Sequence, residues 1–157
     1  MTDSFVGELQ QWFASRLPTA WFAAAPEVSY DSDEILVVGT LPEGVAARAF
    51  REETRAARIG IAQEAEHRYG RQVSWGVVAG GARTLFTSQA SPVMTRLRLD
   101  ERRVLDTLVE AGVARSRSEA LAWCVRLVGR HEADWLRDLH EALTAVRKVR
   151  VEGPAAL

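Results

Sequence analysis

The sequence contains a single cysteine, a single lysine and no apolar stretch of membrane-spanning length. With only Cys124 available, no disulfide can form within the chain, which favours a reducing compartment. The first residues also lack a basic segment followed by an apolar core, which is the pattern of a secretion signal. We therefore expect a cytoplasmic protein that does not contact a membrane.

The sequence also lacks the motifs of common catalytic and metal sites. It contains no P-loop, nucleophile elbow or pair of catalytic carboxylates. His67, His131 and His140 are scattered along the chain, without the close spacing of metal ligands on one helix. The acidic cluster at Asp31 and Asp33 lacks the closing glutamate of a calcium loop, so it is more typical of a turn. We expect no enzymatic activity, no metal ion and no cofactor.

Length and composition are those of a globular protein with one or two domains. The chain has 157 residues, of which 47% are hydrophobic and 26% are charged. Its net charge of −1 provides no overall attraction for nucleic acid. The charge is uneven, because residues 96–130 contain eight arginines and five acidic residues, whereas residues 1–90 contain eight basic and eleven acidic residues. A nucleic-acid-binding surface is therefore expected in the second half of the chain.

The periodicity of residues 1–87 predicts an α+β domain with the element order α-β-β-α-β-β. Helices over 4–16 and 46–69 each have one apolar face, and Gly80-Gly81 is a typical hairpin turn. We expect a two-layer α/β sandwich with an antiparallel sheet and its helices on one face. The polar stretch 88–93 then forms a linker.

An arginine stripe on the second predicted helix has two interpretations. Its members recur at spacings of three and four and are Arg48, Arg51, Arg55 and Arg58. Glu52 and neighbouring acids would neutralise them on an ordinary solvated face. The alternative is an anion-binding surface or a second nucleic-acid surface, which would bind RNA. A protein partner or a small ligand of this domain stays open as well.

The stretch that follows the linker has the most specific pattern in the chain. Alternating leucines and arginines at 95–99 predict a short strand with its leucines on one face. Asp100 is a suitable N-cap for a helix that ends at Gly112. Ser116 and Glu119 form a capping box, which starts a second helix with its own apolar face. One strand and two short helices leave apolar surface uncovered, so two copies are expected to pair.

This pattern resembles the ribbon-helix-helix DNA-binding family, to which MetJ and Arc belong. The sequences TRLRLD, LVEAG and SRSEAL carry the resemblance. It implies a homodimer in which the two strands pair antiparallel and enter the major groove. The base-contacting side chains would be Met94, Arg96 and Arg98, and the phosphate-contacting residues would be Arg102, Arg115, Ser116, Arg117 and Ser118. The spacing after Leu99 departs by about one residue from the family pattern, so a shifted strand register stays open.

Beyond the ribbon-helix-helix segment at 94–130, the periodicity predicts a helix over 131–150 and a frayed tail over 151–157. This helix would extend the dimer or pack on the N-terminal domain, through Trp135, Leu136, Leu139, Leu143 and Val146.

Together these observations predict a sequence-specific transcriptional regulator, a bacterial-type repressor that binds double-stranded DNA as a homodimer or a higher assembly. The alternative is a protein-interaction or antitoxin-like module, in which the ribbon serves only for dimerisation.

Overall fold

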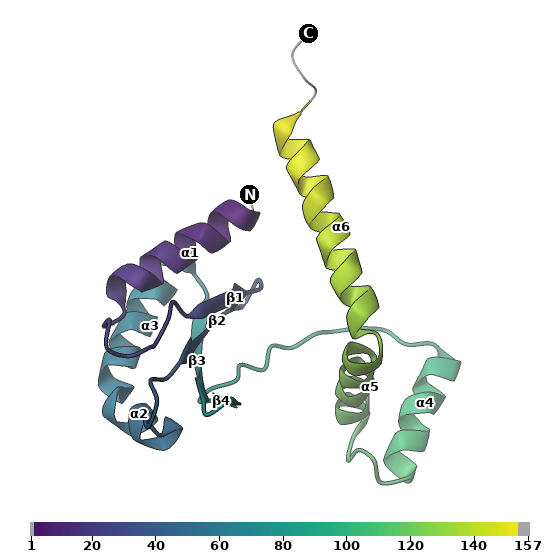
Figure 1. Ribbon diagram of the computed structural model, residues 1–157. Helices are drawn as coiled ribbons and strands as arrows, with labels where there is room; N and C mark the ends of the chain where they lie inside the picture. Colours follow the sequence, from purple (N-terminus) through teal and green to yellow (C-terminus); the bar gives the residue numbers. More distant parts are fainter. Residues whose placement is uncertain (1, 154–157) are drawn as a thin grey trace. The chain divides into compact units, whose positions relative to one another are not determined.

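A computed structural model of the chain describes residues 2–153, with side chains from Phe5 onward (Figure 1). The fold is α+β, as the sequence predicts, with helices and one four-stranded sheet. The chain divides into two compact units, one that extends to Pro92 and one that begins at Val93. This division falls within the linker expected at 88–93.

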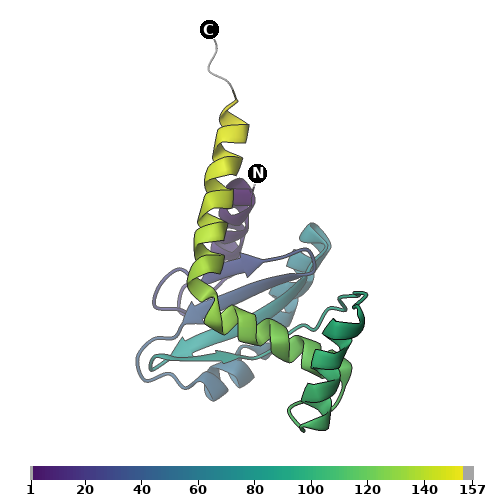
Figure 2. The same ribbon diagram turned by 90° about the vertical axis from the view of Figure 1, so that its right-hand side faces the viewer.

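The N-terminal unit consists of one sheet with helices on one of its faces (Figures 1 and 2). Its elements in chain order are α1 (Thr2–Arg16), β1 (Glu27–Tyr30), β2 (Glu34–Thr40), α2 (Ala47–Glu53), α3 (Arg55–Tyr69), β3 (Gln72–Ala79) and β4 (Ala82–Leu85). The two-layer arrangement follows from the sequence, since each helix has one apolar side to bury and the sheet offers it an apolar face.

The sheet is mixed, so the expectation of an antiparallel sheet is wrong. Its strand order is β1-β2-β3-β4, and both outer pairs are antiparallel. The central pair is parallel, with Glu34 opposite Gln72 and Thr40 opposite Val78. After β2 the chain crosses one face of the sheet through α2 and α3. It returns to the end where β2 began, and β3 therefore runs in the same direction as β2.

The two turns expected from the sequence are present. Gly80 and Gly81 have φ angles of 56° and 81°, the left-handed values that a tight two-residue hairpin requires. At the first hairpin, Asp31 Oδ1 accepts the backbone N–H groups of Asp33 and Glu34, each at 2.8 Å. These hydrogen bonds lower the pKa of the Asp31 carboxyl. The acidic cluster thus shapes a turn, as we expected.

The helix expected over 46–69 is interrupted at Thr54, which separates α2 from α3. Thr54 has φ −94° and ψ 1°, and its hydroxyl donates to the carbonyl oxygen of Phe50 at 2.6 Å. A threonine that bonds back to the preceding turn in this way bends a helix. The interruption brings Phe50 of α2 and Ile61 of α3 into the same core.

The N-terminal unit has a well-filled core between its helices and its sheet. Leu9, Phe13, Ile35, Val37 and Val77 are fully buried. Aromatic rings pack edge to face across this core, and the ring centroids of Phe13 and Trp75 are 6.2 Å apart. The apolar stripe of the first helix is therefore core.

The C-terminal unit consists of α4 (Leu99–Glu110), α5 (Arg117–His131) and α6 (Ala133–Glu152). Residues 88–98 have no regular structure, and the strand expected over 95–99 is not formed in this single chain. A strand needs hydrogen bonds to a neighbouring strand, and no residue between 93 and 153 belongs to a strand that could pair with it. Leu99 is instead the first residue of α4 and is 61% exposed.

The start of α4 also differs from the expectation that Asp100 is its N-cap. The N-cap residue is Arg98, whose backbone N–H donates to Oε2 of Glu101 at 2.6 Å. Asp100 lies in the first turn, where its negative charge still favours the helix N-terminus.

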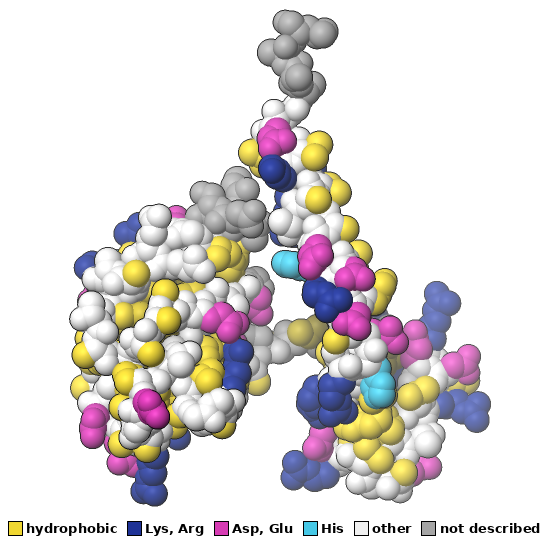
Figure 3. Space-filling model, in the orientation of Figure 1, with side chains coloured by type: hydrophobic (Ala, Val, Ile, Leu, Met, Phe, Trp, Pro, Cys, Tyr) yellow, Lys and Arg dark blue, Asp and Glu magenta, His cyan; other side chains and the backbone are white. Residues whose placement is uncertain are grey.

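Helix α6 extends from the rest of this unit and carries a run of hydrophobic side chains along one edge (Figure 3). All five of its predicted apolar contact positions are exposed, namely Trp135, Leu136, Leu139, Leu143 and Val146. The helix continues to Glu152, two residues into the expected tail, and residues 154–157 lie outside the described part of the chain. None of the helices between residues 2 and 153 is both long and apolar enough to cross a membrane.

Candidate nucleic-acid interface

The predicted base-contacting residues lie on the extended segment that leads into α4. Met94 is 98% exposed, and Arg96 and Arg98 are exposed as well. Leu97, between the two arginines, is half-buried against the small cluster formed by Leu105 and its neighbours. The alternation expected for a strand is thus present at these three positions, although the strand is not. Within residues 2–153, neither guanidinium forms an ion pair with a carboxylate.

Arg102 fastens this segment to α4. Its Nη1 donates to the carbonyl oxygen of Leu97 at 2.5 Å. Arg102, which we predicted to contact phosphate, therefore binds the backbone of the segment that carries Arg96 and Arg98. It holds that segment in place while the two arginines project from it.

The start of α5 has the N-cap predicted from the sequence but only half of the predicted capping box, because the Glu119 carboxylate binds the backbone N–H of Arg115 and not that of Ser116. Ser116 is the N-cap, and its Oγ accepts the backbone N–H of Glu119 at 3.2 Å. The Glu119 carboxylate accepts the backbone N–H of Arg115 at 2.9 Å and its Nε–H at 3.2 Å. These contacts with Arg115 lower the pKa of the Glu119 carboxyl, the backbone hydrogen bond most. The α5 N-terminus is consequently well defined in position.

Arg117 forms the most regular ion pair in this unit, with Asp106 of α4. Nε and Nη2 of Arg117 donate to the two carboxylate oxygens at 2.6 and 2.8 Å, a bidentate geometry. The hydrogen bonds from Arg117 lower the pKa of the Asp106 carboxyl. The pair joins the start of α5 to the middle of α4 and neutralises much of the charge that we expected Arg117 to offer to a phosphate.

Four of the predicted residues come together around one hollow of about 300 Å³. They are Met94, Arg102, Arg117 and Ser118, and apolar side chains including Leu97, Leu105 and Leu121 complete the lining. Arg96, Arg98, Arg115 and Ser116 lie outside this hollow. The structure therefore separates the exposed arginines of the segment from the residues that position the segment and the α5 N-terminus.

Asp106 is a residue of this region that sequence reasoning missed. It lies on a helix that starts before the loop, and its partner Arg117 comes after the loop. No short-range spacing signals such a pair, because the path of the loop between the two helices decides which side chains meet. The sequence indicated only the two ends of that path, the left-handed Gly112 with φ 74° and the N-cap Ser116.

The described residues contain no group of three or more histidine, cysteine, aspartate or glutamate side chains that could hold a metal ion. Cys124, half-buried on α5, packs against the Leu105 cluster. The chemistry of the C-terminal unit is thus that of exposed guanidinium groups, a capped helix N-terminus and uncovered apolar surface.

Comparison with known proteins places the chain in a family with the same two-part organisation. Residues 7–85 match the model of the Rv1265-like protein N-terminal domain, and residues 98–150 match the model of the Mb1296 C-terminal domain. The chain belongs to the Rv1265-like family.

Its relatives include the uncharacterized proteins Mb1296 of Mycobacterium bovis and Rv1265 of Mycobacterium tuberculosis strain H37Rv. The chain is 56% identical to each of them over 156 residues, an alignment that covers 92% of this chain and 69% of the relative. No solved structure matches the chain.

Proposed function

We propose that the protein is a DNA-binding transcriptional regulator that acts as a homodimer. In this proposal, residues 95–98 of two copies pair into a two-stranded ribbon that enters the major groove. The observation that carries it is an extended segment that belongs to no strand, carries the exposed Arg96 and Arg98, and is bound to α4 through Arg102. Such a regulator acts in the compartment that contains the DNA, so the proposal includes a cytoplasmic location.

The incomplete core of the C-terminal unit supports dimerisation. Among its described residues only Leu105, Ala114 and Ala120 are buried hydrophobics. Val125 of α5 is 65% exposed and Val128 is 48% exposed, although both side chains are apolar. A unit with so little buried apolar surface does not reach the stability of an independent domain. A second copy would cover these side chains and supply the missing strand.

The start of α5 supports a role in holding DNA phosphate. The Ser116 hydroxyl accepts the backbone N–H of Glu119. The backbone N–H groups of Arg117 and Ser118, which precede it in the helix, have no backbone acceptor within the helix. Free N–H groups and the helix dipole together favour a bound phosphate. In this arrangement the Arg117 side chain positions α5 through Asp106, and its backbone contacts the phosphate.

Arg96 and Arg98 would read the DNA sequence, because a guanidinium can donate two parallel hydrogen bonds to the edge of guanine. The test begins with selection of bound DNA by the full-length protein from a randomised duplex pool, followed by sequencing. We expect an enriched site with two related halves, since a homodimer presents the same surface twice. Fluorescence anisotropy then measures affinity for that site and for a scrambled duplex.

The decisive variant is Arg96→Gln with Arg98→Gln. We expect each lost arginine to cost about 1–3 kcal/mol of discrimination between the two duplexes. Arg126→Gln with Arg130→Gln is the matched control, because it removes the same charge from exposed positions on α5. Equal losses in both double variants would show that the two arginines contribute only general attraction and would contradict base reading.

The second candidate function is the protein-interaction module, which the ion pairs of Arg115 and Arg117 favour. Their partners Glu119 and Asp106 reduce the positive charge around the proposed phosphate site. Salt dependence separates the two functions, because a DNA binder loses affinity steeply as the salt concentration rises. A stable dimer that enriches no DNA would favour this second function.

A further inference from the structure

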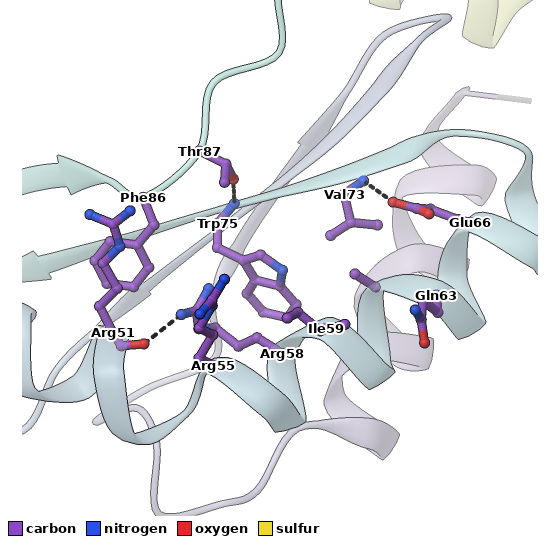
Figure 4. Close-up of a pocket in the computed structure, with 11 residues that line it drawn as sticks. Arg51, Arg55, Arg58, Ile59, Gln63, Glu66, Val73, Trp75, Phe86 and Thr87 are labelled. Carbon is purple, nitrogen blue, oxygen red and sulfur yellow. Dashed lines mark hydrogen bonds between the residues drawn. The ribbon is translucent and has the colours of Figure 1, made fainter.

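We propose that the N-terminal unit has a binding site for a small phosphorylated molecule, in a pocket between α3, β3 and the segment after β4. The pocket has a volume of about 440 Å³, which is within the usual range for small-molecule sites. Arg51, Arg55 and Arg58 line it together with Trp75 and Phe86 (Figure 4).

The three arginines lie at one end of the pocket, near Phe86, whereas Gln63, Val73 and Glu66 lie at the other end (Figure 4). The three arginines come from α2 and α3, which meet at the interruption around Thr54. The Thr54 hydroxyl accepts a hydrogen bond from Nε of Arg58 at 3.0 Å. The interruption at Thr54 therefore also brings these guanidinium groups together.

Arg58 carries the proposal, because it is a buried cation that forms no ion pair with an acidic side chain in the described part of the chain. The residue is 6% exposed, and its Nη2 donates to the carbonyl oxygen of Arg51 at 2.7 Å. Its guanidinium lies over the Phe86 ring, 4.9 Å from the centroid. Among the described residues, its contacts are thus with neutral oxygens and an aromatic ring.

The charges near Arg58 have the same sign as its own. Burial and the neighbouring charges of Arg51 and Arg55 all lower the pKa of Arg58. An arginine nevertheless stays protonated in proteins, so the site keeps its positive charge. Burying a charge among like charges costs stability, and an anion in the pocket would remove that cost.

The shape of the pocket indicates more than a simple anion. A phosphate group fits the arginine end, because guanidinium groups bind phosphate oxygens through paired hydrogen bonds. The volume exceeds what one phosphate needs, and the remainder is lined by apolar Val73 and Ile59 and by the Glu66 carboxylate. The ligand class is therefore a phosphate ester whose body can donate a hydrogen bond.

Pyrophosphate is the probe for this site, since it presents phosphate groups without requiring knowledge of the ester. We expect full-length protein to bind pyrophosphate with saturation at moderate salt. In proton–nitrogen NMR spectra, the signals that shift should include the Trp75 indole N–H and the Nε–H of Arg58. Inorganic phosphate should bind at least about tenfold more weakly, because it can engage fewer of the arginines.

The informative variant is Arg51→Gln with Arg55→Gln, both exposed residues whose backbone contacts are kept. Pyrophosphate affinity should fall by at least about tenfold. The control is Arg48→Gln with Arg68→Gln, which removes the same charge from arginines that pair with Glu52 and Glu8 outside the pocket. Its affinity for pyrophosphate should be unchanged.

Stability without ligand gives a second readout. In an empty anion site the three guanidinium groups repel one another. Arg51→Gln with Arg55→Gln should therefore keep or raise the thermal unfolding midpoint of the N-terminal unit. A purely structural arginine cluster would instead lose stability in this variant. Failure to bind pyrophosphate, or equal losses in both double variants, would overturn the proposal.

Two further outcomes separate this site from nucleic-acid binding. The Arg96→Gln, Arg98→Gln variant should bind pyrophosphate normally, since its changed residues lie in the other unit. A single-stranded RNA that binds wild type, loses affinity in Arg51→Gln with Arg55→Gln, and is not displaced by pyrophosphate would show an RNA surface instead and overturn the proposal.

Discussion

The two units of this protein differ in how completely one chain can bury its apolar residues. The N-terminal unit places residues such as Phe13 and Ile35 at zero exposure between its helices and its sheet. The C-terminal unit buries three hydrophobic residues among those described and leaves the apolar edge of α6 open. The N-terminal unit thus covers its core within one chain, whereas the C-terminal unit leaves apolar side chains of α5 and α6 exposed.

The two units are therefore expected to bind their partners in different ways. A complete domain meets other molecules through specific depressions on its surface, such as the arginine-lined pocket. In the homodimer that we propose, the C-terminal unit would instead meet a second copy through its exposed apolar side chains.

The largest effect is expected in the complete core. Phe13→Ala removes a fully buried ring from the contact with Trp75 and should cost about 3–5 kcal/mol of unfolding free energy. Urea denaturation followed by NMR signals of each unit measures this cost. It should be independent of protein concentration, because this core lies within one chain. A concentration-dependent loss would contradict the view of the N-terminal unit as self-sufficient.

A change in the small core of the other unit should behave differently. Leu105→Ala should destabilise the C-terminal unit by about 2–4 kcal/mol, and the unfolding midpoint of that unit should rise with protein concentration. Sedimentation of the same samples gives the oligomeric state. If the midpoint does not depend on concentration in wild type, the unit folds without a second copy, and the contrast between the units fails.

A smaller effect is expected where Phe22, in the segment between α1 and β1, packs on Gly39 of β2. A Cβ at position 39 would lie 2.2 Å from the nearest ring atoms of Phe22, so Gly39→Ala must displace that ring. We expect a loss of about 1–3 kcal/mol, confined to the N-terminal unit. Gly60→Ala on α3 is the control, because nothing lies within 4 Å of its added Cβ. Similar losses in both variants would mean that crowding at Phe22 is not the cause.

The smallest effect concerns the exposed pair between Asp106 and Arg117. Arg117 lowers the folded-state pKa of Asp106 below the ordinary value of 3.8, so the pair stabilises the C-terminal unit above that pH. This contribution should disappear as the pH falls through the lowered pKa. Asp106→Asn should lack that part of the acid sensitivity, as measured by unfolding midpoints between neutral and acid pH. Unchanged acid sensitivity in the variant would show that the pair does not contribute.

Local signals predicted the parts of the fold that depend on neighbouring residues. The capping of α5 by Ser116 and the turn at Gly80-Gly81 follow from the conformations and hydrogen bonds available to these residues alone. The spacing of apolar residues along α1 likewise identified core residues, because it depends only on the helical repeat. The division near residues 88–93 followed from composition.

The parallel central pair and the burial of Arg58 were not predicted, because both depend on where distant segments meet. The direction of β3 relative to β2 depends on the path of the helices between them. The stripe of arginines was visible in the sequence, yet the interruption at Thr54 decides which member turns inward. The base-reading and phosphate-binding roles of the candidate residues remain predictions.

The parallel pairing of β2 with β3 also has a consequence for the order of folding. Glu34 can meet Gln72 only after α2 and α3 have been synthesised and have begun to form, so this contact closes a long loop. Folding dominated by such distant contacts is slow, whereas local helices such as α4 and α5 form quickly. We therefore expect the folding rate of the N-terminal unit to be set by a first-order step within one chain. In the proposed homodimer, the folding rate of the C-terminal unit should instead depend on protein concentration, because two chains must meet.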